Sequence, residues 1–184
     1  MRKFAVCLLF LLLSGCAEHD ELQTGMELRS RLLQSSQCSF SVDIQADNGQ
    51  ELSEFSMDCT ADAKGSIRFA VTAPASISGI AGTLSAKGGG LTFDGTVLDF
   101  PLLAEGELSP VSAPWIFLNT LRSGNLISAC EEEGRTRLSV DDSYEDDALR
   151  LDIWLDGSNL PVRADVLRSG RRILTLDVKN FTIV

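Results

Sequence analysis

The feature that most constrains the fold is a pair of segments with alternating apolar and polar residues, on either side of an Asn-Gly pair. Residues 38–45 and 51–59 follow this alternation, and Asn48-Gly49 between them accepts the positive φ angles of a type I′ turn. Alternation is typical of strands with one buried and one solvated face. The sequence therefore predicts a β-hairpin with a two-residue turn, whose facing apolar pairs are Cys38 with Cys59, Phe40 with Met57, and Val42 with Phe55.

Similar segments separated by Gly, Asn and Asp predict about eleven strands in all, hence a mainly β (α+β) chain with an antiparallel sheet. In the last pair of strands, apolar residues face each other if Ser169, Gly170 and Arg171 form a three-residue turn. The run 87–90, Lys-Gly-Gly-Gly, lacks the Lys-Ser/Thr of a phosphate-binding loop and is predicted to be a hairpin turn. The other predicted strands are 66–73, 80–86, 91–94, 97–102, 125–130, 136–141, 149–155, 161–167 and 173–183.

A helix is predicted to precede the strands. It covers 20–34, with an apolar side that we expect to pack on the sheet rather than to bind a partner. The residues of this side are Leu22, Met26, Leu32 and Leu33.

A second helix is predicted at 112–124, with a proline in its first turn and a glycine past its last. Its apolar surface covers more than one stripe, as expected of a helix that plugs or lids an open sheet. A plain core helix is the alternative. Under the lid interpretation, residues of this helix and of the first hairpin line a ligand: Trp115, Phe117, Leu118, Leu121, Phe40, Phe55 and Met57.

The N-terminus has the features of an export signal. Arg2 and Lys3 precede an apolar run, 4–13, that suits a secretory h-region and is too short to span a membrane. The run ends in Leu13-Ser14-Gly15-Cys16, which resembles the lipobox of bacterial lipoproteins, whose cysteine carries acyl chains such as palmitate. An ordinary cleavable signal is the alternative.

The lipobox resemblance implies a signal peptide at 1–15, a lipidated tether at 16–19 and one domain at 20–184. It also implies that Cys16 is the first mature residue and the lipid-modified one. The protein would then lie at the extracytoplasmic face of the cell membrane, or at the outer membrane of a diderm organism.

Charge and composition exclude several function classes. The formal net charge is −10, and it falls to −12 when Arg2 and Lys3 leave with the signal, so the chain repels nucleic acid. The single histidine, His19, lies in the tether, so Ser/His/Asp and Cys/His sites are not expected. The acidic runs 131–133 and 141–147 lack EF-hand spacing and are predicted to be solvated loops. We expect no metal, no cofactor and no enzyme activity, although composition leaves carboxylate-pair glycosidase chemistry open.

Three of the five cysteines remain in the folded part, because Cys7 leaves with the signal and Cys16 is lipidated. The predicted register places Cys38 and Cys59 at a directly facing, non-hydrogen-bonded pair, where side chains are closest. We therefore predict a disulfide between them and a free thiol at Cys130. Two facing thiols in an apolar wall are the alternative.

The C-terminal run 154–163, WLDGSNLPVR, is followed by a strand, Gly170, another strand and Asn180-Phe181. This pattern resembles the end of the LolA/LolB, LprG and RseB group of unclosed barrels. The stretch 109–115 is similar to uncharacterised lipoproteins of clostridial bacteria. The resemblance implies an unclosed antiparallel half-barrel with an N-terminal helix and a mid-chain lid or plug helix.

Members of that group bind lipids or lipoprotein acyl chains between the concave sheet and the helices, or bind protein partners. No residue here matches the arginine that latches the lid of the LolA carriers, which speaks against a shuttle cycle. We therefore expect a non-enzymatic, membrane-anchored lipoprotein that holds a lipid or other hydrophobic ligand in its concave face. The alternative is an interaction module that binds or regulates an envelope or cell-wall protein, as similar lipoproteins do in clostridial spore germination.

Overall fold

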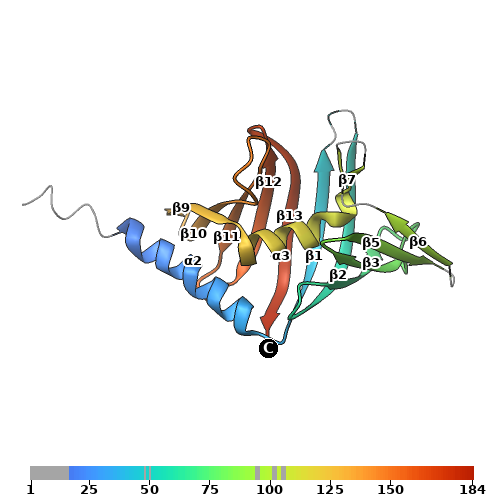
Figure 1. Ribbon diagram of the computed structural model, residues 1–184, viewed down its shortest axis with the longest axis horizontal. Helices are drawn as coiled ribbons and strands as arrows, with labels where there is room; N and C mark the ends of the chain where they lie inside the picture. The colour runs from blue at the N-terminus through green and yellow to red at the C-terminus, as the bar shows by residue number, and fades with distance from the viewer. Residues whose placement is uncertain (1–16, 48, 50, 94–95, 101–102, 105–106) are drawn as a thin grey trace, which may run out of the picture.

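The computed structural model describes residues 17–47, 49, 51–93, 96–100, 103–104 and 107–184. The predicted signal peptide and Cys16 lie outside these residues. Eleven strands form one antiparallel sheet in the order β6-β5-β4-β3-β2-β1-β13-β12-β11-β10-β9, so β6 and β9 are its two edges. The prediction of a mainly β, unclosed antiparallel sheet with two helices is confirmed (Figure 1).

The elements are bounded as follows. The strands of the large sheet are β1 (Gln37–Asp47), β2 (Leu52–Asp62), β3 (Ile67–Ala73), β4 (Ala81–Ser85), β5 (Gly88–Phe93), β6 (Thr96–Phe100), β9 (Asn125–Glu132), β10 (Arg135–Asp141), β11 (Leu149–Leu155), β12 (Pro161–Arg168) and β13 (Arg171–Ile183). A separate small ladder joins β7 (Leu103–Ala104) to β8 (Glu107–Leu108). The helical elements are α2 (Ala17–Gln34), the 3-10 helix η1 (Pro110–Ser112) and α3 (Ala113–Ser123). Residues 17–19 of the predicted tether are thus helical.

The sheet is curved, and α3 runs across its concave side (Figure 1). Helix α2 lies against β9, β10 and α3. One hydrophobic core joins the inner faces of the strands to both helices, and its members extend from Leu22 to Ile183. Every described member of this core thus lies downstream of the predicted signal peptide and of Cys16. Within the described part of the chain, no helix is long and apolar enough to cross a membrane.

The first hairpin forms, but its predicted register is wrong by two residues. Asp47 pairs with Leu52, so the loop comprises residues 48–51 instead of Asn48-Gly49 alone. The Asp47 carboxylate accepts a hydrogen bond from the backbone N–H of Gly49 at 2.7 Å, which stabilises this wider turn. A shift by two residues keeps each side chain on its predicted face.

The last hairpin has the predicted register in its body, where Val166 pairs with Leu174, but not at its tip. The turn consists of Ser169 and Gly170 alone, with φ angles of 51° and 76°. Two positive φ angles make a type I′ turn, whose twist matches that of the flanking strands. The predicted three-residue turn is replaced by this turn and a β-bulge at Ile173.

Helix α2 packs on the core with only part of the predicted side: Leu32 is buried and Leu22 is partly buried against the core, as predicted, but Met26 and Leu33 are not. Met26 and Leu33 are 57% and 58% exposed, whereas Leu28 is buried. The reason is a close approach at Gly25, where an added Cβ would lie 3.0 Å from Leu138 Cδ2 of β10. The side of the helix that carries this glycine therefore faces the sheet.

The predicted turn at 87–90 is displaced, because the turn lies at 86–87 and the three glycines belong to β5. A fourth glycine, Gly82 of β4, pairs with Phe69 of β3. A Cβ on Gly82 would lie 2.3 Å from the carbonyl oxygen of Gly90 and 2.7 Å from Phe69 Cζ. Glycine thus leaves room for the buried aromatic ring on this part of the sheet.

Candidate functional site

Helix α3 fills the concave side of the sheet at β1 and β13. Phe117 is fully buried, and its ring meets Phe40 of β1 edge to face, with 5.7 Å between centroids. It meets Phe181 of β13 in the same way at 6.3 Å. Leu118 and Leu121 are each 1% exposed. The helix is therefore a plug whose apolar side chains pack into the core.

The remaining predicted ligand-lining residues have similar surroundings. Met57 is buried, whereas Phe55 and Trp115 are partly buried against the core. None of the seven residues belongs to the described lining of the cavity between η1 and the β12–β13 hairpin. Their contact with a ligand stays a prediction. For Phe117, Leu118 and Leu121, which are buried, it requires α3 to move away from the sheet.

Two arginines hold the C-terminal end of α3. Arg29 of α2 donates from Nε to the carbonyl oxygen of Leu121 at 3.0 Å. Arg122 donates to the carbonyl oxygens of Asp62 and Ala63 at 3.2 and 3.0 Å, in the turn between β2 and β3. Burial lowers the pKa of Arg29. Since the last carbonyls of a helix lack partners within it, these contacts fix this end of α3.

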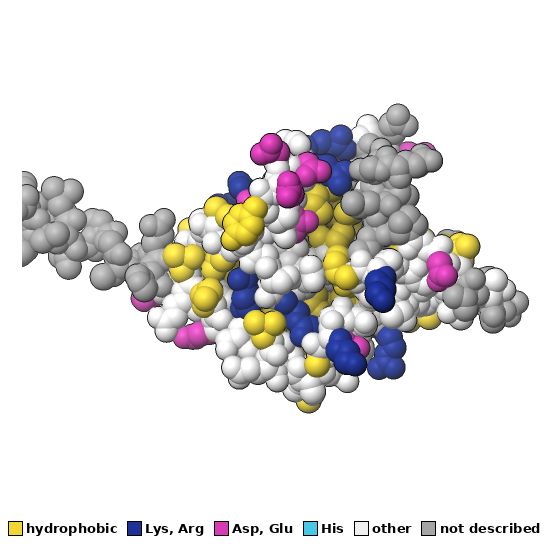
Figure 2. Space-filling view, in the orientation of Figure 1, with side chains coloured by type: hydrophobic (Ala, Val, Ile, Leu, Met, Phe, Trp, Pro, Cys, Tyr) yellow, Lys and Arg dark blue, Asp and Glu magenta, His cyan; other side chains and the backbone are white. Residues whose placement is uncertain are grey.

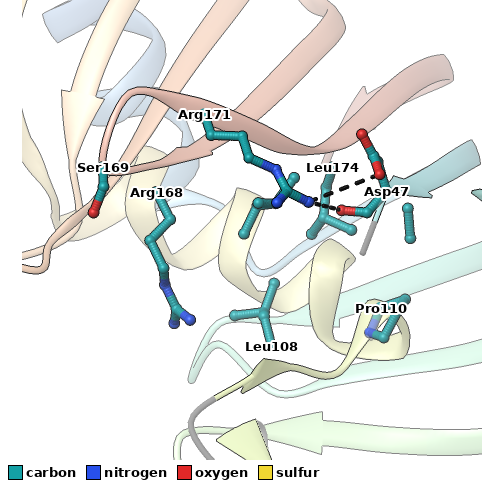
Figure 3. A pocket seen from close by; sticks show the side chains of 9 residues that line it. Asp47, Leu108, Pro110, Arg168, Ser169, Arg171 and Leu174 are labelled. Atoms are coloured by element: carbon teal, nitrogen blue, oxygen red, sulfur yellow. Dashed lines mark hydrogen bonds and ion pairs between the residues drawn. The ribbon is translucent and has the colours of Figure 1, made fainter. Parts of the chain in front are cut away.

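The other end of α3 continues from η1, which borders a cavity of about 360 Å³ (Figure 3). The cavity lies between η1 and β8 on one side and the β12–β13 hairpin on the other. Its apolar lining consists of Ala46, Leu108, Pro110, Ile173 and Leu174, and its polar lining of Asp47, Arg168, Ser169 and Arg171. Figure 2 shows hydrophobic side chains in a hollow on this face, with Lys and Arg side chains at its upper end.

The floor of this cavity is continuous with the hydrophobic core. Ala46 and Leu174 are members of the buried core, and Leu108 and Ile173 are partly buried against it. An apolar group that enters the cavity would therefore lie directly on core side chains. Such a concave apolar surface with a few polar groups at its rim is typical of small-molecule sites.

The polar rim comes mainly from the tip of the β12–β13 hairpin. Arg171 donates from Nη2 to the carbonyl oxygen of Asp47 at 3.0 Å, and the same nitrogen lies 3.7 Å from Asp47 Oδ1. Arg168 is the cross-strand partner of Arg171, and its side chain extends toward β8, where Leu108 lies (Figure 3). Both members of the Arg171–Asp47 pair are more than half exposed, so the pair contributes little to stability.

The β-bulge decides which arginine reaches the cavity. At this position β13 has one extra residue, Ile173, and both Ile173 and Leu174 line the cavity. The alternation then continues so that Arg171 faces the cavity. Arg172 instead donates from Nη1 to Asp165 at 3.1 Å. Without the bulge, Arg172 would take the place of Arg171.

A larger hollow of about 690 Å³ lies on β4, β5 and β6. Its described lining is made mostly of glycine, Ser and Thr residues, with Lys87 and Asp99, and Phe100 is the one large apolar side chain there. This lining suits a hydrophobic ligand less well than the cavity beside η1.

No family model matches the chain, and no curated protein matches it. Among solved structures, it is similar to an uncharacterized conserved protein from Thermus thermophilus, with a TM-score of 0.49 and 13% identity over 86% of each chain. It is similar to a LolA superfamily protein from Nitrosomonas europaea, with a TM-score of 0.44 and 11% identity over 87% of this chain and 93% of that one. It is also similar to the lipoprotein LppX from Mycobacterium tuberculosis, with a TM-score of 0.43 and 14% identity over 88% of this chain and 93% of that one.

The C-terminal run 154–163 and the strands after it led to the prediction of a fold like that of the LolA/LolB, LprG and RseB group. At these identities and TM-scores, the likeness concerns the general fold and indicates no ligand. The likeness to clostridial lipoproteins stays a prediction.

The disulfide predicted between Cys38 and Cys59 is not formed, and Cys130 is also a free thiol. Because the first hairpin has the wider turn, Cys38 faces Ala61 and Cys59 faces Phe40. The two cysteines are therefore diagonal neighbours, a less favourable arrangement for a disulfide than a direct pair. Burial raises the pKa of Cys38 to about 11 and also raises the pKa of Cys59. Burial therefore disfavours the reactive thiolate form of both cysteines.

The described residues contain no group of three or more His, Cys, Asp or Glu side chains that could hold a metal ion. The cavity residues were not identified from the sequence, because they come from the ends of elements far apart in the chain. The sequence has one local indication of this cavity. It is the pair Arg168 and Arg171, which stand on either side of a Ser-Gly turn.

Proposed function

We propose that this protein is a lipid-anchored binding protein of the bacterial envelope, attached at Cys16, and that its half-barrel takes a hydrophobic ligand into the cavity between η1 and the β12–β13 hairpin. The observation that carries the proposal is the apolar floor of this cavity, which is continuous with the core. The volume of about 360 Å³ falls within the range of small-molecule sites, roughly 300–1,000 Å³.

Burial of hydrocarbon would supply the affinity. Each methylene group that leaves water for the apolar floor contributes about 0.8 kcal/mol. A ligand that fills only this cavity leaves α3 in place. A longer one would displace α3 from its η1 end, because Arg29 and Arg122 hold the other end.

Extraction of lipid from the segment 17–184, purified from a bacterial periplasm and analysed by mass spectrometry, tests the proposal. Leu108→Glu places a carboxylate in the cavity and should abolish the bound ligand while the thermal transition remains cooperative. Leu98→Glu is the matched control, since Leu98 is 64% exposed on β6 and outside the cavity lining. Equal ligand content in both variants would refute binding at this site.

A second candidate is a module that binds or regulates an envelope protein. The observation in its favour is the filled concave side, where α3 leaves the predicted ligand-lining residues in the core. If the wild-type segment neither retains a lipid nor binds an added one, this candidate replaces the first.

A further inference from the structure

The polar rim of the cavity has a feature that burial of hydrocarbon does not require. Arg168 and Arg171 are directly paired across the two strands, at the last position before the Ser169–Gly170 turn. Like charges at directly opposite positions destabilise a hairpin. Their placement at one cavity therefore suits an anionic group that interacts with both.

The charge of the cavity differs from that of the chain. The whole sequence has a formal net charge of −10, so basic residues are in the minority. The described lining nevertheless holds two guanidinium groups and one carboxylate, that of Asp47. Asp47 lies against Arg171 through its backbone and side chain. Among these described side chains, the guanidinium groups outnumber the carboxylates.

The shape of the site adds a hydrocarbon chain to that anion. The arginines stand at the hairpin tip, whereas Leu108, Pro110 and Leu174 form the apolar part of the lining. The volume of about 360 Å³ is near the lower end of the range for small-molecule sites, roughly 300–1,000 Å³, which suits one chain rather than two or three.

We propose that the cavity binds a single-chain amphiphile with an anionic head group, a carboxylate or phosphate, whose head lies between Arg168 and Arg171 and whose chain lies on the apolar floor. This inference rests on the proposed function and specifies its ligand class. Guanidinium groups suit this task because their N–H donors match the two oxygens of a carboxylate or phosphate. Arg168 and Arg171 select the head group, and the apolar floor supplies most of the affinity.

Titration calorimetry on the segment 17–184 tests the inference with three probes: decanoate, decanol and butyrate. Decanoate and decanol share a ten-carbon chain and differ in charge, whereas butyrate keeps the carboxylate and loses most of the chain. We expect decanoate to bind about tenfold more tightly than decanol. Arg168→Gln and Arg171→Gln should each remove about threefold of that difference without changing decanol binding. Arg150→Gln is the control, because Arg150 pairs with Asp141 and does not line the cavity.

The outcomes separate the inference from the function on which it rests. Equal affinity for decanoate and decanol, unchanged in the arginine variants, would overturn the head-group assignment and keep the hydrophobic site. Butyrate binding as tight as decanoate would overturn the amphiphile in favour of a simple anion site. Absence of binding by both ten-carbon probes would refute the proposed function itself.

Discussion

Replacing Phe117 by alanine tests whether α3 is a packed plug or a loosely held lid. The side chain is fully buried, and its ring contacts Phe40 and Phe181 edge to face. A buried Phe→Ala change costs about 3–5 kcal/mol, from lost transfer energy and the cavity left behind. The two aromatic contacts, each worth about 0.5–1.5 kcal/mol, place Phe117 in the upper part of that range. Since single domains are stable by about 5–15 kcal/mol, a large part of the stability should be lost.

Urea unfolding of the segment 17–184, followed by circular dichroism, measures this change. The midpoint should fall while the slope with denaturant stays the same. Trp115→Ala is the matched control, because it removes a larger ring that is only partly buried, and it should cost less. A loss below about 1 kcal/mol for Phe117→Ala, typical of ordinary surface or tolerant sites, would show that α3 is loosely held and would favour the predicted ligand contact of this helix.

Three further outcomes are expected. Cys16→Ser should release the protein from membranes washed with carbonate, and retention at the wild-type level would contradict the lipid anchor. Gly82→Ala should lower the stability measured by thermal denaturation by about 1–3 kcal/mol, because its Cβ would meet the Gly90 carbonyl oxygen. Gly157→Ala is the control and should be nearly neutral, because an added Cβ there has no atom within 4 Å. Equal effects of the two changes would refute the steric argument. Hydrogen bonds from Lys179 and Ser56 hold the pKa of Asp43 below its ordinary value of 3.8, so its contribution is present above that value and is lost as pH falls through the folded-state pKa. Asp43→Asn should therefore make stability less dependent on pH below about pH 4, and an unchanged acid profile would exclude this role.

Most of the sheet could be predicted because its strands are buried on one face only. Strand β11, for example, has the predicted bounds, since Leu149, Leu151, Ile153 and Leu155 are buried and alternate with partly or fully exposed residues. Because one face is buried and the other is solvated, apolar and polar residues alternate with a period of two in the sequence. The same reasoning identified β12 and the body of its pairing with β13.

Details of the turns could not be predicted. The alternation of apolar and polar residues shows on which face of the sheet a side chain lies, but not which residue of the neighbouring strand it pairs with. The first hairpin is equally amphipathic in the predicted and observed registers, and the side chain of Asp47 favours the wider turn. The failure of the disulfide prediction follows from that turn. At the last hairpin, the bulge at Ile173 exchanges the faces of Arg171 and Arg172, and no period in the sequence marks it.

The lid interpretation of α3 was open for a different reason. A helix that is apolar on more than one side is expected both in a core and against a ligand. Only the three-dimensional packing of Phe117 against Phe40 and Phe181 distinguishes these cases.

The position of β13 between β1 and β12 has a consequence for how the chain folds. Cys38 pairs with Ile183, so one partner of the first strand of the sheet lies 183 − 38 = 145 residues further along the chain. Such contacts close long loops and are slow to form. As the chain leaves the ribosome, β1 and β2 can pair early, but the other edge of β1 stays open until β13 has emerged. A chain that ends before residue 171 would therefore leave two half-sheets, each with an exposed edge that favours aggregation.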